Sequence, residues 1–223
     1  MNSFENFSKL VQSRRSIRKF NSEPVSEEII KEIFEVAQFA PSNCNTQPWK
    51  AYVVRGEQAN DMKQVLLDTI GQGKFQLDFP YDDSLYEGEF KDRQSAAAKL
   101  FYTAAGISRE DKEMRQKFFN DNLTFYGAPQ VAFLFMPSWC GVREAADVGM
   151  FAQNLILSMR ARGVGSCPQT LLGFNADAVR EQLGISDDLK LLFGISFGYF
   201  DDDEPLNLVR TERDSVDGVL TII

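Results

Sequence analysis

The chain has 223 residues, enough for one complete hydrophobic core or two small ones. Its formal net charge of -8 at pH 7 disfavours nucleic-acid or anionic-membrane binding, because the long-range field repels polyanions. The sequence has no histidine, which excludes catalytic sites of the Ser-His-Asp and Cys-His types and histidine metal sites.

The three cysteines, Cys44, Cys140 and Cys167, are odd in number and form no CxxC pair. This pattern argues against a disulfide or zinc framework and favours the reducing cytoplasm. The first residues lack a basic region followed by an apolar run, so we expect no signal peptide. No apolar stretch approaches the roughly 18 residues that a transmembrane helix needs. We therefore expect a cytoplasmic protein that does not enter a membrane.

Two helices are predicted near the N-terminus. Apolar residues at helical spacing predict the first helix over residues 3–13. The second begins after Ser26, a favourable N-cap that is followed by two glutamates at the positive end of the helix dipole. The expected buried stripe of this helix is Ile29, Ile33, Val36 and Ala37.

The middle of the chain predicts strands at 50–54 and 129–137, with helices between them. A helix is expected at 57–70, and a further helical region ends near Gly127. Residues 71–93 are rich in Gly, Asp, Tyr and Phe without clear periodicity. We interpret them as a long, mobile excursion near the substrate side, because such segments inside a domain are more often functional than idle.

The C-terminal part predicts a strong helix over 144–162, with Gly163 as its C-terminal cap. A short helix at 175–184 and a strand at 189–200 follow. The apolar tail at 217–223 is expected to be extended and to pair with a sheet edge, either of this chain or of another subunit. The simplest interpretation is one α+β domain spanning residues 1–223.

A cluster of positive charge occupies residues 14–20, "RRSIRKF". In an extended segment Arg14, Ser16 and Arg18 point to one side and Arg15 to the other. The planar guanidinium fork of arginine suits phosphate, and a hydroxyl adds a donor. The segment suits a small anion, but taken alone it is more typical of a solvated basic turn after a helix, because basic clusters are common without a ligand.

Three further segments are candidates for ligand contact. The polar loop "APSNCNTQPWK", residues 40–50, suits a planar polar ligand; the alternative is an ordinary loop with Trp49 in the core. In "GVGSCPQTLLGF", residues 163–174, Gly163 and Gly165 permit close approach to a ligand; the alternative is a helix-end turn. In "NLVRTER", residues 207–213, the arginines bind an anion or form surface ion pairs.

In this order and spacing, the segments resemble the FMN-dependent nitroreductase family over most of the chain. The motifs that carry the resemblance are "RRSIRKF", "APSNCNTQPW", "GAPQVAFLF", "GMFAQNLILSMRARGVGSCPQ" and "NLVRTER". The resemblance implies a central mixed, mainly antiparallel β-sheet flanked by helices. It also implies an intertwined homodimer with an extended C-terminal tail and two FMN sites at the subunit interface.

The resemblance also implies which residues hold FMN. Arg14 and Ser16 would contact the phosphate and ribityl side, with Arg15 nearby, and Arg18 would lie near flavin N1 and O2. The partner subunit would supply its copies of Pro41, Ser42, Asn43 and Asn45. The remaining expected contacts are Asn122, Pro168, Gln169, Thr170, Leu171, Arg210 and Arg213. Asn122 is preferred over Asn120, and family members often carry a lysine near it that this chain lacks.

The function implied by the resemblance is NAD(P)H-dependent, two-electron reduction of a nitroaromatic or another electron-poor acceptor by a ping-pong mechanism. The flavin carries the chemistry, so no side-chain nucleophile is expected. Aromatic residues of 71–93 would either cover the acceptor or pack that segment onto its own subunit. Alternatives are a dehalogenase, a quinone or flavin reductase, a non-catalytic FMN-binding dimer, and an anion binder without flavin. The preference between NADH and NADPH stays open.

Overall fold

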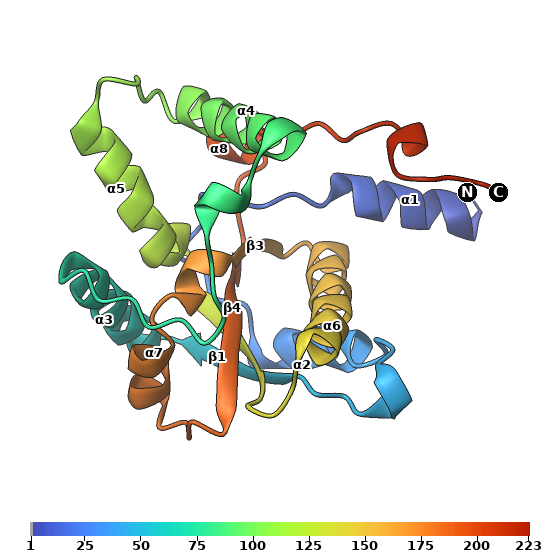
Figure 1. Cartoon of the computed structure of the whole chain (residues 1–223), viewed down its shortest axis with the longest axis horizontal. Helices are drawn as coiled ribbons and strands as arrows, with labels where there is room; N and C mark the ends of the chain where they lie inside the picture. The colour runs from blue at the N-terminus through green and yellow to red at the C-terminus, as the bar shows by residue number, and fades with distance from the viewer. Residues whose placement is uncertain (1) are drawn as a thin grey trace.

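A four-stranded antiparallel β-sheet organises the computed structural model, which describes residues 2–223 (Figure 1). Its strands are β1 (Lys50–Arg55), β2 (Gln130–Pro137), β3 (Gly165–Gln169) and β4 (Leu189–Gly198), in the order β1-β2-β4-β3. Every pairing between these strands is antiparallel, and two isolated parallel bridges join other segments to the fold. The predicted mainly antiparallel sheet is confirmed.

Side chains of the central strand β2 alternate between two hydrophobic layers, as the pleat of a strand requires. Ala132, Leu134 and Met136 belong to one buried cluster. Val131, Phe133 and Phe135 belong to the other. A register shift at Leu134/Phe135 brings Leu191 of β4 into the second cluster. Both faces are covered, which explains why β2 is an almost uninterrupted apolar run.

Helices form the two outer layers (Figure 1). Residues of α2 (Glu27–Ala37) and α6 (Val142–Ala161) complete the first cluster, and those of α3 (Glu57–Gly71) and α7 (Ala176–Leu183) complete the second. As predicted, the Ser26 side chain caps α2 by accepting a hydrogen bond from the Ile29 amide. The expected stripe of α2 is corrected at Val36, which is 58% exposed, while Ile30 is buried instead.

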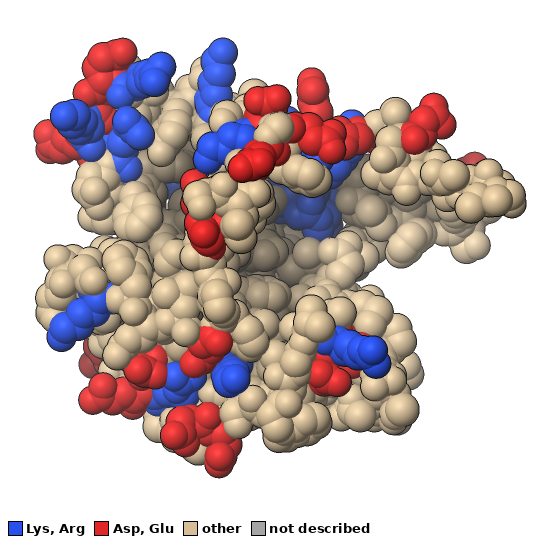
Figure 2. Space-filling view, in the orientation of Figure 1, with Lys and Arg blue, Asp and Glu red and all other residues tan. Residues whose placement is uncertain are grey.

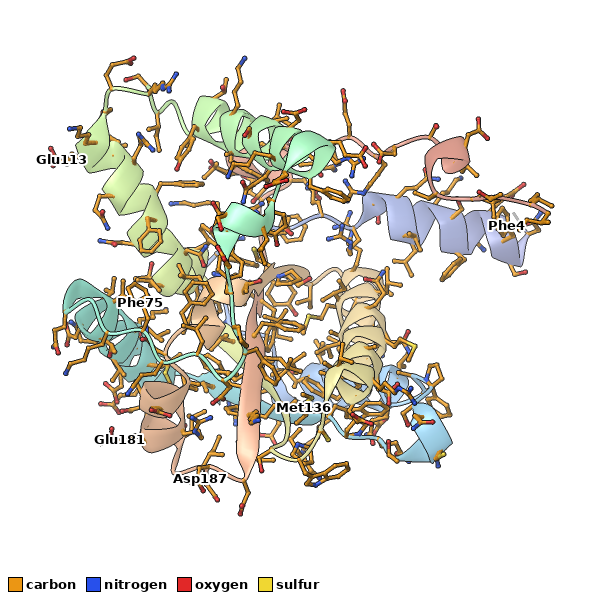
Figure 3. All side chains as sticks on the ribbon, in the orientation of Figure 1. Phe4, Phe75, Glu113, Met136, Glu181 and Asp187 are labelled. Atoms are coloured by element: carbon orange, nitrogen blue, oxygen red, sulfur yellow. The ribbon has the colours of Figure 1, made fainter. Side chains whose placement is uncertain are left out.

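The remaining helices lie away from the sheet. They are α1 (Ser3–Ser13), α4 (Gly88–Ala104), α5 (Lys112–Leu123) and the short α8 (Pro205–Leu208). Helix α1 projects from the body, and Phe4 at its outer end is 75% exposed (Figure 3). Helix α4 begins at Gly88, so the last six residues of the predicted excursion 71–93 are helical. No helix within residues 2–223 is long and apolar enough to cross a membrane.

Two other predictions are corrected by the packing. Residues 165–169 form a strand and not a turn, because β3 pairs with β4 at the sheet edge. Gly165 approaches protein and not a ligand: an added Cβ would lie 2.5 Å from Phe200 and 2.8 Å from Ile17. Within this chain the tail 217–223 joins no sheet edge, and Val219, Leu220, Ile222 and Ile223 are exposed; its pairing with another subunit stays a prediction. Gly163 has the left-handed φ of 74° expected after a helix.

Gly165→Ala tests this packing. The methyl group would overlap two buried or half-buried side chains, so we expect a loss of about 1–3 kcal/mol in the free energy of unfolding. Gly71→Ala is the matched control, because nothing lies within 4 Å of its added Cβ. That control should be neutral or stabilising by up to about 1 kcal/mol. Urea unfolding followed by far-UV circular dichroism measures both, and equal effects would contradict the close approach.

Candidate anion site

A cavity of about 680 Å³ lies between the N-terminal segment, α4 and the C-terminal segment. Its cationic lining residues are Arg14, Arg15, Arg18, Arg210 and Arg213. Ser16 adds a hydroxyl group and Phe101 of α4 an aromatic face. Figure 2 shows Lys and Arg atoms recessed in a hollow below α4, although the chain as a whole carries more acidic than basic residues. The volume is within the usual range for a small organic ligand.

The extended path of residues 14–20 positions these side chains. Ser16 forms a parallel bridge with Ser166, and the Ile17 amide donates to the Ser166 carbonyl at 3.0 Å. Burial alternates along the segment: Arg15 and Ile17 are buried, while Arg14, Ser16 and Arg18 are half-buried. The predicted alternation is seen in this burial pattern, and Arg15 differs from its neighbours in pairing with Asp202 at 2.5 Å, although it also lines the cavity.

Asn207, which is fully buried, joins the basic segment to the C-terminal segment. Its side-chain oxygen accepts from the amides of Arg18 and Lys19 at 3.0 and 3.2 Å. Its side-chain nitrogen donates to the carbonyls of Lys19 and Asp201 at 2.9 and 3.0 Å. Its own carbonyl accepts from Arg15 and from Arg210. One amide therefore fixes the backbone between the arginines on both sides of the cavity.

In the part of the chain that the structure describes, four arginines in this cavity form no ion pair with a carboxylate. Among residues 2–223, no Asp or Glu lies within ion-pair distance of Arg14, Arg18, Arg210 or Arg213. Their guanidinium hydrogen bonds go to neutral oxygens, such as the Ser16 carbonyl for Arg18 and Thr211 for Arg213. Burial and the nearby charge of Arg213 lower the pKa of Arg14. Such a cluster is unfavourable until an anion enters, so a phosphate fits this donor set.

The end of β3 and the residues that follow it contain four of the predicted flavin contacts. Pro168 and Thr170 are exposed, whereas Gln169 between them is buried and Leu171 is half-buried. The Gln169 amide nitrogen donates to the Asn122 backbone and side-chain oxygens at 2.7 and 2.8 Å. Ser196 donates to the Gln169 side-chain oxygen. The side chains of Gln169 and Asn122 are thus bound to each other, and none of these five residues lines the cavity as defined above.

The polar loop at 41–47 lies elsewhere in the same chain. None of Pro41, Ser42, Asn43 and Asn45 lines the cavity, and the η1 turn (Asn43–Asn45) packs against α6. Buried Asp147 of α6 accepts from the Asn43 amide at 3.0 Å, and Ser42 accepts from the Gln47 amide at 3.0 Å. Cys44, Asn45 and Gln47 have positive φ, so the loop is held in a strained shape. Trp49 stacks on Phe151 in the core, as one of the predicted alternatives required.

The excursion is anchored before α4. Gln76 forms a parallel bridge with Asn175, and Asp78 pairs with buried Arg180 at 2.5 Å. Phe75 and Tyr81 pack their rings against Phe174, with centroids 6.3 and 5.1 Å apart. Figure 3 shows Phe75 beside the body of the molecule. These two rings therefore pack the segment onto its own subunit, which was one of the two alternatives considered for its aromatic residues.

Comparison with known proteins assigns the chain to a family. The model of the Nitroreductase family matches residues 11–199, so the chain belongs to this family. It is 42% identical over 205 residues to nitroreductase NfnB of Mycolicibacterium smegmatis, covering 92% of this chain and 87% of the relative. It is 31% identical over 220 residues to a 4-nitrobenzoate reductase of Pseudomonas putida, covering 96% and 94%.

The fold is also shared with a solved structure. The crystal structure of the FMN-dependent nitroreductase NfnB from Mycobacterium smegmatis in complex with NADPH superimposes with a TM-score of 0.96. The two chains are 39% identical, and each is covered completely. The family resemblance proposed from the sequence motifs is therefore confirmed.

Sequence reasoning missed three residues that shape the site. Asn207 was considered only as the first letter of "NLVRTER", although its side chain joins the two arginine segments. Phe101 stacks on Arg18, with the Arg18 guanidinium carbon 3.6 Å from the ring centroid. Asp147 supports the strained loop from within α6. No local pattern marks these residues, because their partners are distant in sequence.

Asn207→Ala tests the bridge between the two arginine segments. Losing four buried side-chain hydrogen bonds should lower the free energy of unfolding by about 2–4 kcal/mol. The control is Asn60→Ala on the exposed surface of α3, expected to change it by less than about 0.5 kcal/mol. Chemical denaturation measures both variants. Equal stabilities of the two would contradict the proposed importance of the Asn207 amide.

Proposed function

We propose that this protein is an FMN-dependent, NAD(P)H-oxidising nitroreductase. The observation that carries the proposal is the cavity with four arginines that lack carboxylate partners, in a chain of the nitroreductase family. The relative of known structure is described as FMN-dependent and in complex with NADPH, which supports FMN as cofactor and NADPH as reductant. A relative that reduces 4-nitrobenzoate supports a nitroaromatic acid as one acceptor.

The residues of the cavity fit FMN by charge and by chemical type. Arg14, Arg210 and Arg213 would hold the phosphate, and Ser16 would donate to its ribityl side. Arg15 would contribute mainly through the segment it fixes, because it is already paired with Asp202. Arg18 would place its charge near the pyrimidine edge of the ring, where negative charge develops on reduction.

The remaining contacts belong to the end of β3, the residues that follow it, and Asn122. Exposed Pro168 and Thr170, with Leu171, would cover the ring and exclude water. The hydrogen bonds between Gln169 and Asn122 would keep both segments at a fixed separation beside it. When bound, FMN supplies the two-electron chemistry that passes from the nicotinamide to the acceptor. No nucleophilic side chain is required of the protein.

We also propose that the working unit is a homodimer in which each cavity is completed by its neighbour. The loop at 41–47 does not line the cavity of its own chain, yet it is rigidly shaped and exposed. A second groove of about 760 Å³ runs between α1, α2 and α6 and is mostly apolar, with Phe7, Val36 and Phe39 on its surface. Burying this groove against a second copy would remove apolar surface from water.

Location in the cytoplasm is part of the proposal. It is supported by the three cysteines, which are free thiols in the structure. Cys140 and Cys167 are buried, and burial raises the pKa of both thiols. Such thiols persist best in a reducing compartment.

Flavin spectroscopy tests the function. We expect the purified protein to show the absorbance of bound FMN, to lose it on anaerobic addition of NADPH, and to regain it when 4-nitrobenzoate is added. The variant Arg14→Gln/Arg213→Gln should bind FMN at least about tenfold more weakly, because it loses two charge-assisted contacts to the phosphate. Its affinity for riboflavin, which lacks the phosphate, should be unchanged.

The control is Arg55→Gln, which removes an exposed arginine that pairs with Glu27 far from the cavity. It should leave both affinities unchanged. Bound flavin that NADPH and NADH leave oxidised would indicate a binding role instead of catalysis. A colourless protein that refuses added FMN would overturn the cofactor assignment.

Mixed dimers test the contribution of the loop across the interface. One chain carries Arg14→Gln/Arg213→Gln, and the other carries Ser42→Trp, which fills the loop with a large ring. Neither homodimer should retain FMN well. If the loop serves the neighbouring cavity, the mixed dimer has one intact site per two chains, and FMN should return to about half occupancy.

The result separates the two arrangements. If the loop served its own chain, each chain of the mixed dimer would carry one defect, and no FMN would return. Size-exclusion chromatography with light scattering confirms that the mixed species forms. A monomeric protein with full FMN occupancy would also contradict the proposed dimer.

A further inference from the structure

Helix α4 covers the arginine cavity but is not anchored by a hydrophobic core. None of its 17 residues is buried. Two specific contacts tie it to the site: Arg93 pairs with Asp214 of the C-terminal segment at 2.5 Å, and Phe101 stacks on Arg18. With so little apolar burial, contacts of this kind contribute much of what holds the helix over the cavity.

The environment of Arg18 is aromatic instead of acidic. Its guanidinium carbon lies 3.6 Å from the centroid of Phe101 and 5.8 Å from that of Tyr126. Its Nη1 atom also donates to the Ser16 carbonyl at 3.4 Å. No carboxylate lies within ion-pair distance of it among residues 2–223. The flat cation is therefore held by ring faces and neutral oxygens.

This choice of partner has an electrostatic consequence. A carboxylate would fix the Arg18 side chain but would cancel its charge within the site. An aromatic face attracts the guanidinium through the ring quadrupole and leaves the full positive charge in place. Stacking also removes rotamer freedom that a long arginine otherwise keeps. Arg18 is thus both fixed and uncompensated.

We propose that Phe101 is a positioning residue that holds the Arg18 charge against the cofactor and so strengthens binding of the reduced flavin relative to the oxidised flavin. The inference rests on the proposed FMN site and adds a residue from α4 to it. Tyr126 supports Arg18 less closely, from a backbone of left-handed φ. The position of α4 is thereby coupled, through the Phe101 ring, to the position of the Arg18 charge in the site.

The test compares Phe101→Leu with Phe101→Trp in the FMN-loaded protein. Leucine keeps apolar bulk without a ring face, while tryptophan keeps the face. The readout is the two-electron reduction potential of bound FMN, which reports the ratio of affinities for the reduced and oxidised forms. Phe101→Leu should lower that ratio about tenfold, equivalent to a potential about 30 mV more negative. Phe101→Trp should restore most of it.

Tyr102→Leu is the matched control on the same helix. The Tyr102 ring also makes a cation–π contact with an arginine, because the Arg115 guanidinium carbon lies 5.6 Å from its ring centroid. It lines a different hollow, between α4 and α5. Its loss disturbs the packing of α4 without touching Arg18, so the potential should stay within about 5 mV, a change of less than about twofold. An equal shift in both variants would show a merely structural effect and overturn the proposal.

A double-mutant cycle with Arg18→Gln provides the decisive comparison. If Phe101 acts through Arg18, then adding Phe101→Leu to Arg18→Gln should change the potential no further. Additive shifts would overturn the proposal. A wild-type potential in Phe101→Leu would also overturn the proposal for Phe101. The proposed function would still stand in that case if NADPH reduces the bound FMN. A wild-type protein that holds no FMN would overturn both proposals together.

Discussion

The site depends on positive charge that the protein holds together without neutralising it. Arginines brought close repel one another, and burial and Arg213 already lower the pKa of Arg14. The fold has to supply the opposing free energy through contacts that carry no negative charge. It does so with the Ser16–Ser166 bridge, the four side-chain hydrogen bonds of Asn207, and the ring of Phe101. A protein of net charge -8 can thereby present a local site for a phosphate.

The rest of the architecture serves to place these contacts. Strand β3 lies at the sheet edge beside β4, and there it meets the extended residues after α1. Gly165 allows this approach, because any side chain would collide with Phe200 and Ile17. Burial on both faces of β2 and β4 gives the rigid base on which the arginine segments are held. Helix α4, by contrast, has no buried residue and closes the cavity through polar and aromatic contacts.

Local patterns predicted much of the fold because helices and strands are set by short-range periodicity. The apolar run of β2, the Ser26 cap of α2 and the left-handed Gly163 all had local physical signatures that the structure bears out. Predictions were wrong where burial depends on partners from elsewhere. Val36 was assigned to the core but faces the groove beside α1, and β3 was missed because only pairing with β4 makes it a strand.

The sequence by itself determined the inventory of the site: arginines with alternating sides at 14–18, the motifs of the nitroreductase family, and the absence of histidine. These are properties of residue type and spacing, which need no folded chain. Only the tertiary structure decided that Arg15 forms an ion pair with Asp202, that Asn207 joins the two arginine segments, and that Phe101 stacks on Arg18. Partners more than 80 residues apart meet through packing of the whole sheet and its helices, so their contacts leave no local pattern to detect.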